Sequence, residues 1–309
     1  GRDWVYVFYT LPGGRNDRVE RINSAGTREV LMRALPSGSP YHHGGILAFG
    51  PDGKLYVSHG EAHDQDRAQQ PRELGGKIYR INPDGSIPDD NPFEGEPTWS
   101  YGHRNPFGLT FDPKNGSLWE TENGPEAHDE VNIIERGKNY GWPIARGNSG
   151  DDRFVDPVVD YENIVVPTGI AFAPKAFGEE HVHDVFVGTY QQGSIRRLFL
   201  DADRTRVTSD TLFARIPGGV TALARGPDGL YAATPDAVIR LSVAGGASPS
   251  PSDTPPAHPP REDDDESPLG GSTQGRIQGF LVITTAALGG FVLSRWLRDR
   301  LNRDRREPR

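Results

Sequence analysis

A strand–turn–strand unit recurs along this chain of 309 residues and restricts what it can fold into. Each unit begins with an alternating apolar strand, and three of four continue through a Pro- and Gly-containing turn to a second strand carrying Leu-Tyr or Leu-Trp. Phe49, Phe111 and Phe172 mark the first three units and are 62 and 61 residues apart. Such a period fits one four-stranded propeller blade with long loops. The units are residues 46–60, 108–124, 169–174 and 220–234.

The composition agrees with an all-β fold. The 38 glycines and 27 prolines suit many tight turns, and helical periodicity is scarce before residue 275. At this period about 240 residues make four blades. An ordinary β-sandwich with similar turns by chance is the alternative.

Cysteine content and charge exclude several functions. With no cysteine, the chain has no disulfide, thiolate metal site or cysteine nucleophile. The net charge is −9, although seven arginines stand against three acids after residue 294. The acidic body therefore argues against nucleic acid as a partner.

The C-terminal segment predicts a membrane anchor. Residues 277–294 carry no charge, and as a helix they would span about 27 Å. We expect a transmembrane helix at 276–296 and a basic cytoplasmic tail at 297–309, with the body outside the cell membrane by the positive-inside rule. The Pro/Ser/Asp-rich residues 245–275 should form a disordered linker. A buried core helix is the alternative, and export would require a signal upstream of this chain.

Potential bases, cations and turn carbonyls gather in the predicted loops between residues 41 and 143. Loops at one end of a repeated β-scaffold are where such folds build their sites. The motifs are His42-His43-Gly44-Gly45, Gly102-His103-Arg104-Asn105-Pro106, Glu122-Asn123-Gly124-Pro125, Asp129-Glu130-Val131-Asn132 and Asn139-Tyr140-Gly141-Trp142-Pro143.

These motifs, in this order and at this spacing, resemble those of the pyrroloquinoline quinone (PQQ)-dependent aldose sugar dehydrogenases, in the glucose/sorbosone dehydrogenase family of six-bladed β-propellers. The resemblance covers residues 4–241 and is strongest from 42 to 143. It implies a propeller domain at 1–244. If closure needs six blades, the missing blades are expected upstream of Gly1.

The resemblance also implies roles for three loop residues. His42 falls on the catalytic histidine, which removes the proton from the anomeric hydroxyl while hydride passes to the quinone. Its neighbour His43 stays open as an alternative base. Arg104 and Asn105 match the pair that contacts the cofactor, where a guanidinium would stabilise the reduced quinone.

Two calcium sites follow from the same resemblance. Gly124 and Pro125 lie where backbone carbonyls bind the Ca²⁺ that holds the cofactor. Glu130 and the carbonyl of Tyr140 match a second, structural site, with Asp129 a less certain ligand. The alternative for the second site is that these acids, with Glu122 and Glu126, are simply solvated.

The chain also departs from the family pattern. Phe107 stands where the pattern has glutamine, and residues 219–221 replace an Arg-x-Arg pair. Gln191 stands in place of a cofactor-contacting lysine and is the cofactor contact expected there. No tyrosine equivalent follows the Gly-Trp-Pro segment, within residues 144–148. Fewer cations would therefore face an acidic cofactor.

The sequence thus favours a membrane-anchored, PQQ- and Ca²⁺-dependent oxidoreductase. It would oxidise an aldose or a related aldehyde or alcohol, with His42 as base and Arg104 beside the quinone. A calcium-binding propeller without the cofactor, serving as an extracellular binding or adhesion module, is the main alternative. A calcium-dependent lactonase-type propeller is a third. The sugar, the electron acceptor and the oligomeric state stay open.

Overall fold

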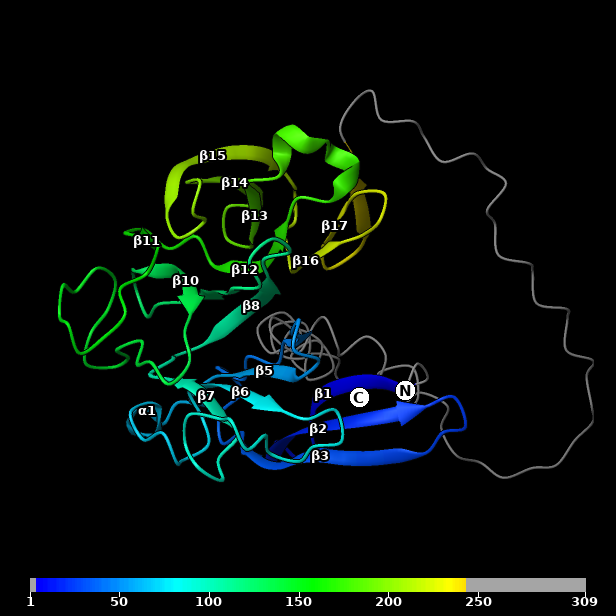
Figure 1. The fold of residues 1–309 in the computed structure, drawn as a ribbon, viewed down its shortest axis with the longest axis vertical. Helices are drawn as coiled ribbons and strands as arrows, with labels where there is room; N and C mark the ends of the chain where they lie inside the picture. The colour runs from blue at the N-terminus through cyan, green and yellow to red at the C-terminus, as the bar shows by residue number, and fades with distance from the viewer. Residues whose placement is uncertain (1–3, 243–309) are drawn as a thin grey trace, which may run out of the picture.

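The computed structural model describes residues 4–242 as five antiparallel sheets that follow one another along the chain (Figure 1). The first sheet has three strands in the order β1-β2-β3, and the last has three in the order β16-β17-β18. The three sheets between them have four strands each. This is the all-β propeller arrangement that the repeats predict.

The strands keep their chain order within every sheet. The first sheet is β1 (Trp4–Thr10), β2 (Asn16–Asn23) and β3 (Arg28–Pro36); the second is β4 (Leu47–Phe49), β5 (Leu55–His59), β6 (Lys77–Ile81) and β7 (Thr98–Tyr101). The third is β8 (Pro106–Phe111), β9 (Leu118–Glu122), β10 (Asp129–Ile134) and β11 (Val159–Tyr161). The fourth is β12 (Pro167–Phe172), β13 (Asp184–Thr189), β14 (Ser194–Leu200) and β15 (Val207–Arg215); the fifth is β16 (Ala222–Arg225), β17 (Leu230–Ala233) and β18 (Val238–Leu241). Short helices α1 (Gln65–Ala68), η1 (Lys175–Phe177) and η2 (Glu179–His181) lie in the connections.

The estimate of four blades in this length is wrong, because the described chain forms five sheets. The additional sheet comes from residues 4–36, whose first hairpin turns through Leu11 to Gly14 without the Leu-Tyr signature of the other units. The predicted sixth blade does not occur within residues 4–242.

The first strands of neighbouring sheets lie against one another. β12 packs against both β8 and β16, and β4 packs against β1 and β8. The sheets therefore follow an arc in Figure 1, from β1 at the bottom to β17 at the upper right. The strands β5, β6, β9, β12 and β13 are buried along their whole length, as expected for strands covered on both faces.

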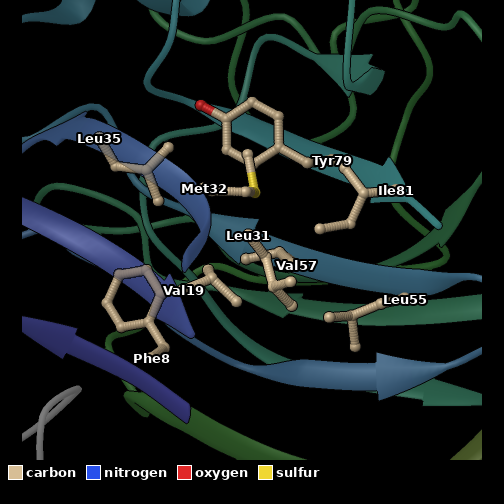
Figure 2. Close-up of a cluster of buried hydrophobic side chains, with 9 residues drawn as sticks. All are labelled: Phe8, Val19, Leu31, Met32, Leu35, Leu55, Val57, Tyr79 and Ile81. Carbon is tan, nitrogen blue, oxygen red and sulfur yellow. The ribbon is translucent and has the colours of Figure 1, made fainter. Parts of the chain in front are cut away.

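A cluster of buried apolar side chains fills each junction between sheets. Between the first two sheets the cluster unites Leu35 of β3 with Val57 of β5 and Tyr79 of β6, all fully buried (Figure 2). Trp119 and Phe172 meet between the third and fourth sheets, with ring centroids 5.8 Å apart. This packing fixes each sheet, and thus each site loop, relative to the next.

The topology gathers the predicted site at one end of the propeller. In an up-and-down sheet, connections from the second to the third strand lie at the same end as connections from one sheet to the next. Segments 60–76, 123–128 and 190–193 are of the first kind; segments 37–46 and 102–105 are of the second.

The predicted linker, membrane helix and basic tail at residues 245–309 lie outside the described residues. Within 4–242 no helix is long and apolar enough to cross a membrane.

Candidate active site

The loops that carry His42 and Arg104 are joined by the segment that follows β5. The amide of Ala62 donates to the His42 carbonyl (3.1 Å), and the amide of Glu61 donates to the Arg104 carbonyl (3.0 Å). A Cβ on Gly60 would collide with the His42 carbonyl, so only glycine fits where the three segments meet. Backbone hydrogen bonds to this segment thus hold the predicted base and the predicted cation next to each other.

His42 has the geometry of a base held by a carboxylate. Its Nδ1 lies 2.6 Å from Oε1 of Glu61, whose side chain is 3% exposed. Since the carboxylate only accepts, Nδ1–H donates to it and Nε2 carries the lone pair. Nε2 makes no hydrogen bond to any residue between 4 and 242 and is available to take a proton. Glu61 is a site residue that the motif analysis missed.

The surroundings of His42 keep it neutral. Burial has the largest effect and lowers the pKa of His42; the hydrogen bond that His42 donates to Glu61 raises it, and the charge of Arg104 lowers it. The net pKa lies below the ordinary value. An exposed histidine, His63, also packs against His42, with ring centroids 4.2 Å apart and the rings tilted by 36°.

His43 is unsuited to act as the base, although it is adjacent in sequence. Its Nδ1 lies 2.6 Å from Oδ2 of Asp17, and its Nε2 lies 2.7 Å from the Ser39 carbonyl. Both ring nitrogens therefore face acceptors, and neither is free to receive a proton from a substrate. Of the two adjacent histidines, the geometry favours His42.

Arg104 reaches across to the carbonyl turn that follows β9. Its Nη1 donates to the carbonyls of Asn123 (2.8 Å) and Gly124 (3.0 Å), and its guanidinium lies 5.3 Å from the Trp142 ring centroid. Nε of Arg104 and Oδ1 of Asn105 are buried without a hydrogen-bond partner in residues 4–242. One donor and one acceptor are therefore available to hydrogen-bond a ligand beside the predicted base.

The Gly124 turn presents carbonyl oxygens to a positive group, since the guanidinium of Arg104 occupies that position. Asp129 stabilises the turn: its carboxylate accepts from the amides of Gly124 (2.9 Å), Val165 (2.7 Å) and Val166 (2.8 Å). Because both of its oxygens accept from backbone amides, Asp129 holds the turn in place. Pro125 lines a cavity of about 20 Å³ beside this turn. Backbone carbonyl oxygens of this kind are among the ligands that calcium accepts.

A buried group of carboxylates lies behind the turn. Glu120 and Glu122 share one face of β9, and Glu130 on β10 is paired with Glu122 in the ladder. Asn132 bridges the group by donating to Glu120 and to Glu130, both at 3.1 Å. Oε1 of Glu120 and Oδ1 of Asn132 have no partner in the described part of the chain.

Burial and mutual repulsion act on these carboxylates together. Burial, with the charge of Glu122, raises the pKa of Glu130 to about 8 and raises that of Glu120 well above its ordinary value. A bound cation would offset the repulsion between these carboxylates. The partnerless oxygens of Glu120 and Asn132 are ligands of the kind that calcium prefers. Tyr140 and Glu130 both line the cavity that Pro125 lines, so the residues predicted to bind calcium lie around one cavity.

The positions of Glu120, Glu126 and Gln191 differ from the predictions. Glu120, which the motif analysis missed, belongs to the buried group, whereas Glu126 is exposed. The alternation of Glu120 and Glu122 on one strand is the signal that could have found it. Gln191 is exposed at the turn after β13, and its backbone amide donates to the Val165 carbonyl (3.2 Å).

Comparisons with known proteins agree with this architecture. The model of the Glucose / Sorbosone dehydrogenase family matches residues 1–241. The chain belongs to this family. It is 35% identical over 262 residues to an uncharacterized protein of Synechocystis, and 31% identical over 242 residues to an aldose sugar dehydrogenase of Escherichia coli. Each match covers 72% of this chain but only 63% and 64% of those relatives, respectively.

Solved structures of the family also resemble the chain. The PQQ-bound aldose sugar dehydrogenase of Streptomyces coelicolor matches with a TM-score of 0.67 and 33% identity, over 75% of this chain and 69% of that one. An oxidoreductase (glucose dehydrogenase) of Thermus thermophilus matches with a TM-score of 0.66 and 35% identity, over 75% and 73%. The dehydrogenase fold therefore extends over most of the described residues.

Proposed function

We propose that this chain is a PQQ- and calcium-dependent dehydrogenase that oxidises an aldose, or a related aldehyde or alcohol. The geometry of His42 carries the proposal: its Nδ1 is bound to buried Glu61, while Nε2 makes no hydrogen bond within residues 4–242, and the same segment joins His42 to Arg104. Family membership and the PQQ-bound relative support the cofactor.

Nε2 of His42 would take the proton of the anomeric hydroxyl as the C–H bond beside it breaks. When bound, PQQ supplies a quinone that accepts the hydride, so that an aldose becomes a lactone. The imidazolium formed on His42 is stabilised by Glu61 through the 2.6 Å hydrogen bond. This arrangement holds the proton at a defined atom until solvent removes it.

Arg104 and Asn105 would hold the cofactor. The partnerless Nε of Arg104 and Oδ1 of Asn105 are the groups left for it among the described residues, and the positive charge would favour the anionic, reduced form. Gln191 is a weaker contact than the lysine of the family pattern, because it brings no charge.

Calcium fits two places in this scheme. The carbonyls of Gly124 and Pro125 would bind the ion next to the cofactor, with the Arg104 guanidinium displaced from the Gly124 carbonyl and Asp129 holding the turn. Glu130 and the Tyr140 carbonyl would bind the second ion, and the partnerless Oε1 of Glu120 in the described residues supports Glu120 as an additional ligand.

We further propose that the propeller lies outside the membrane and is anchored by residues 276–296. The uncharged stretch and the arginines that follow it support this orientation.

A non-catalytic, calcium-binding propeller is the second candidate. The exposed side chain of Gln191 and the replacement of the Arg-x-Arg pair at 219–221 favour it, because both weaken binding of an acidic cofactor.

Titration of the full chain in detergent with PQQ, with and without Ca²⁺, separates these candidates. Absorbance reports binding, and dye reduction with a panel of aldoses reports turnover. We expect calcium-dependent binding and turnover that His42→Ala abolishes. The control His181→Ala, in the connection between β12 and β13, should preserve both. A folded, calcium-loaded protein that binds no PQQ would leave the non-catalytic propeller.

A further inference from the structure

A buried charge pair connects the first sheet to the loop that carries the proposed base. Asp17 lies on β2 and is fully buried, and its Oδ2 lies 2.6 Å from Nδ1 of His43. Thr10 donates to the other carboxylate oxygen of Asp17 at 2.7 Å, and His59 on β5 approaches Oδ2 at 3.3 Å. Asp17 therefore joins β1, β2, β5 and the 42–45 loop at one point.

The hydrogen-bond pattern defines the charge state of His43. Nδ1 faces a carboxylate and Nε2 faces the Ser39 carbonyl at 2.7 Å, so both nitrogens must donate. A neutral ring would set one nitrogen lone pair against an oxygen lone pair. The bonds to Asp17 and Ser39 outweigh burial and raise the pKa of His43 above its ordinary value, in agreement with an imidazolium.

His59 completes the network as a neutral ring. Its Nε2 donates to Asp17, while Nδ1 is buried with no partner inside residues 4–242. Burial lowers the pKa of His59, and the charges of His43 and Lys77 lower it further. His59 on β5 is thus the other titratable group that contacts the pair, and Lys77 on β6 acts on His59 through its charge.

The backbone of the base residue needs such an anchor. His42 has φ = +62°, a left-handed conformation that is strained for a residue other than glycine. Gly44 and Gly45 follow with positive φ, and a Cβ on Gly45 would lie 2.7 Å from the Phe8 ring. Strained residues persist where their surroundings over-determine them, and here His43 supplies a fixed point one residue away.

We propose that the Asp17–His43 pair is the positioning device of the base: it fixes the 42–45 loop on the first sheet and thereby aims Nε2 of His42. His43 is accordingly a positioning residue, and it acts only while it is protonated. This inference rests on the proposed function for its catalytic consequence, whereas its structural content can be tested without turnover.

The test is Asp17→Asn, which retains size and removes the charge. The matched control is Asp184→Asn in the fourth sheet, where Asp184 also lies 2.6 Å from a histidine, His181, and is 1% exposed. We expect hydrogen exchange at the Ala62 and Gly45 amides to accelerate by about tenfold or more in Asp17→Asn relative to the control, because loosening one anchor frees the loop. Equal exchange in both variants would overturn the proposal.

Turnover and its pH profile provide the second readout. We expect kcat of Asp17→Asn to fall by about tenfold or more at nearly constant KM, since misaligning a base affects the chemical step. Because the folded pKa of His43 is raised, the pair stabilises the loop at low pH and ceases to do so as pH rises through that pKa. The wild type should therefore have an alkaline limb that Asp17→Asn lacks, and the same alkaline limb in both proteins would contradict the proposal.

A wild-type measurement keeps the proposal testable if Asp17→Asn does not fold. Nitrogen-15 NMR of the imidazoles, assigned with His43→Gln, should show both nitrogens of His43 protonated at pH 7; a single tautomer there would overturn the proposal. If the wild type fails to oxidise any sugar, the proposed function fails, but hydrogen exchange and NMR still decide the role of the pair.

Discussion

Removal of the Glu61 charge should impair the proposed base in a way that the structure quantifies. Glu61 is 2% exposed and accepts from His42 at 2.6 Å, which is a buried, charge-assisted hydrogen bond worth about 1.5–3 kcal/mol. If that energy is realised on the imidazolium during proton transfer, Glu61→Gln should lower kcat by about 10- to 100-fold.

The same substitution should move the pH profile. Glu61 raises the pKa of His42 against the larger effect of burial, so removing its charge lowers that pKa further. The acidic limb of kcat/KM, where His42 becomes protonated, should therefore shift to lower pH.

The assay is steady-state dye reduction from about pH 4 to 9 with PQQ and Ca²⁺ saturating. Glu73→Gln is the control, because Glu73 is exposed on the same 60–76 segment. An acidic limb that stays in place in Glu61→Gln, with kcat within a factor of about two of the wild type, would refute the assignment of this pair.

Three further predictions concern the calcium group, the loop junction and the core. Without calcium, the free energy of unfolding should fall as pH rises from about 5 to 8, because the folded state holds protons on carboxyls whose pKa is raised. Glu120→Gln should flatten this pH dependence and reduce the rise in Tm that calcium causes. Glu126→Gln, at an exposed position, should do neither. Gly60→Ala should abolish turnover and lower Tm through collision with a site carbonyl, and Gly38→Ala, with open space around it, should match the wild type in the same scan. Leu35→Ala should cost about 2–5 kcal/mol in urea unfolding, because Leu35 is fully buried between two sheets; a loss below about 1 kcal/mol would contradict that packing.

The sequence predicted those blades that carry alternating strands joined by a Pro- and Gly-containing turn. The turns at 51–53 and 226–229 join alternating strands, and both occur as predicted. The sheet at 4–36 lacks that signal, and the blade count was therefore too low. A hairpin with an irregular turn is specified by packing against its neighbour as much as by its own residues.

The site was predictable where a motif names its residues and unpredictable where spatial neighbours complete it. Motifs predict the roles of His42 and Arg104, and the structure places the two residues side by side through the segment that carries Glu61. Asp17 is 26 residues from His43 in sequence, and no spacing rule links them. Glu120 was overlooked because its role depends on the pairing of β9 with β10.

The neighbours of His42 have opposite effects on its pKa. This combination suits the proposed base, which must both accept and release a proton. The charge of Arg104 and burial keep the ring unprotonated before the reaction, and Glu61 limits the cost of the imidazolium while it exists. Beyond the effect of burial, Glu61 raises the pKa of His42 and the charge of Arg104 lowers it, so loss of either residue should shift that pKa in the opposite direction. Because both loops are bonded to residues 60–62, any displacement of that segment changes both effects together. Substitutions in the 60–62 segment should therefore alter the pH dependence of turnover as well as its rate.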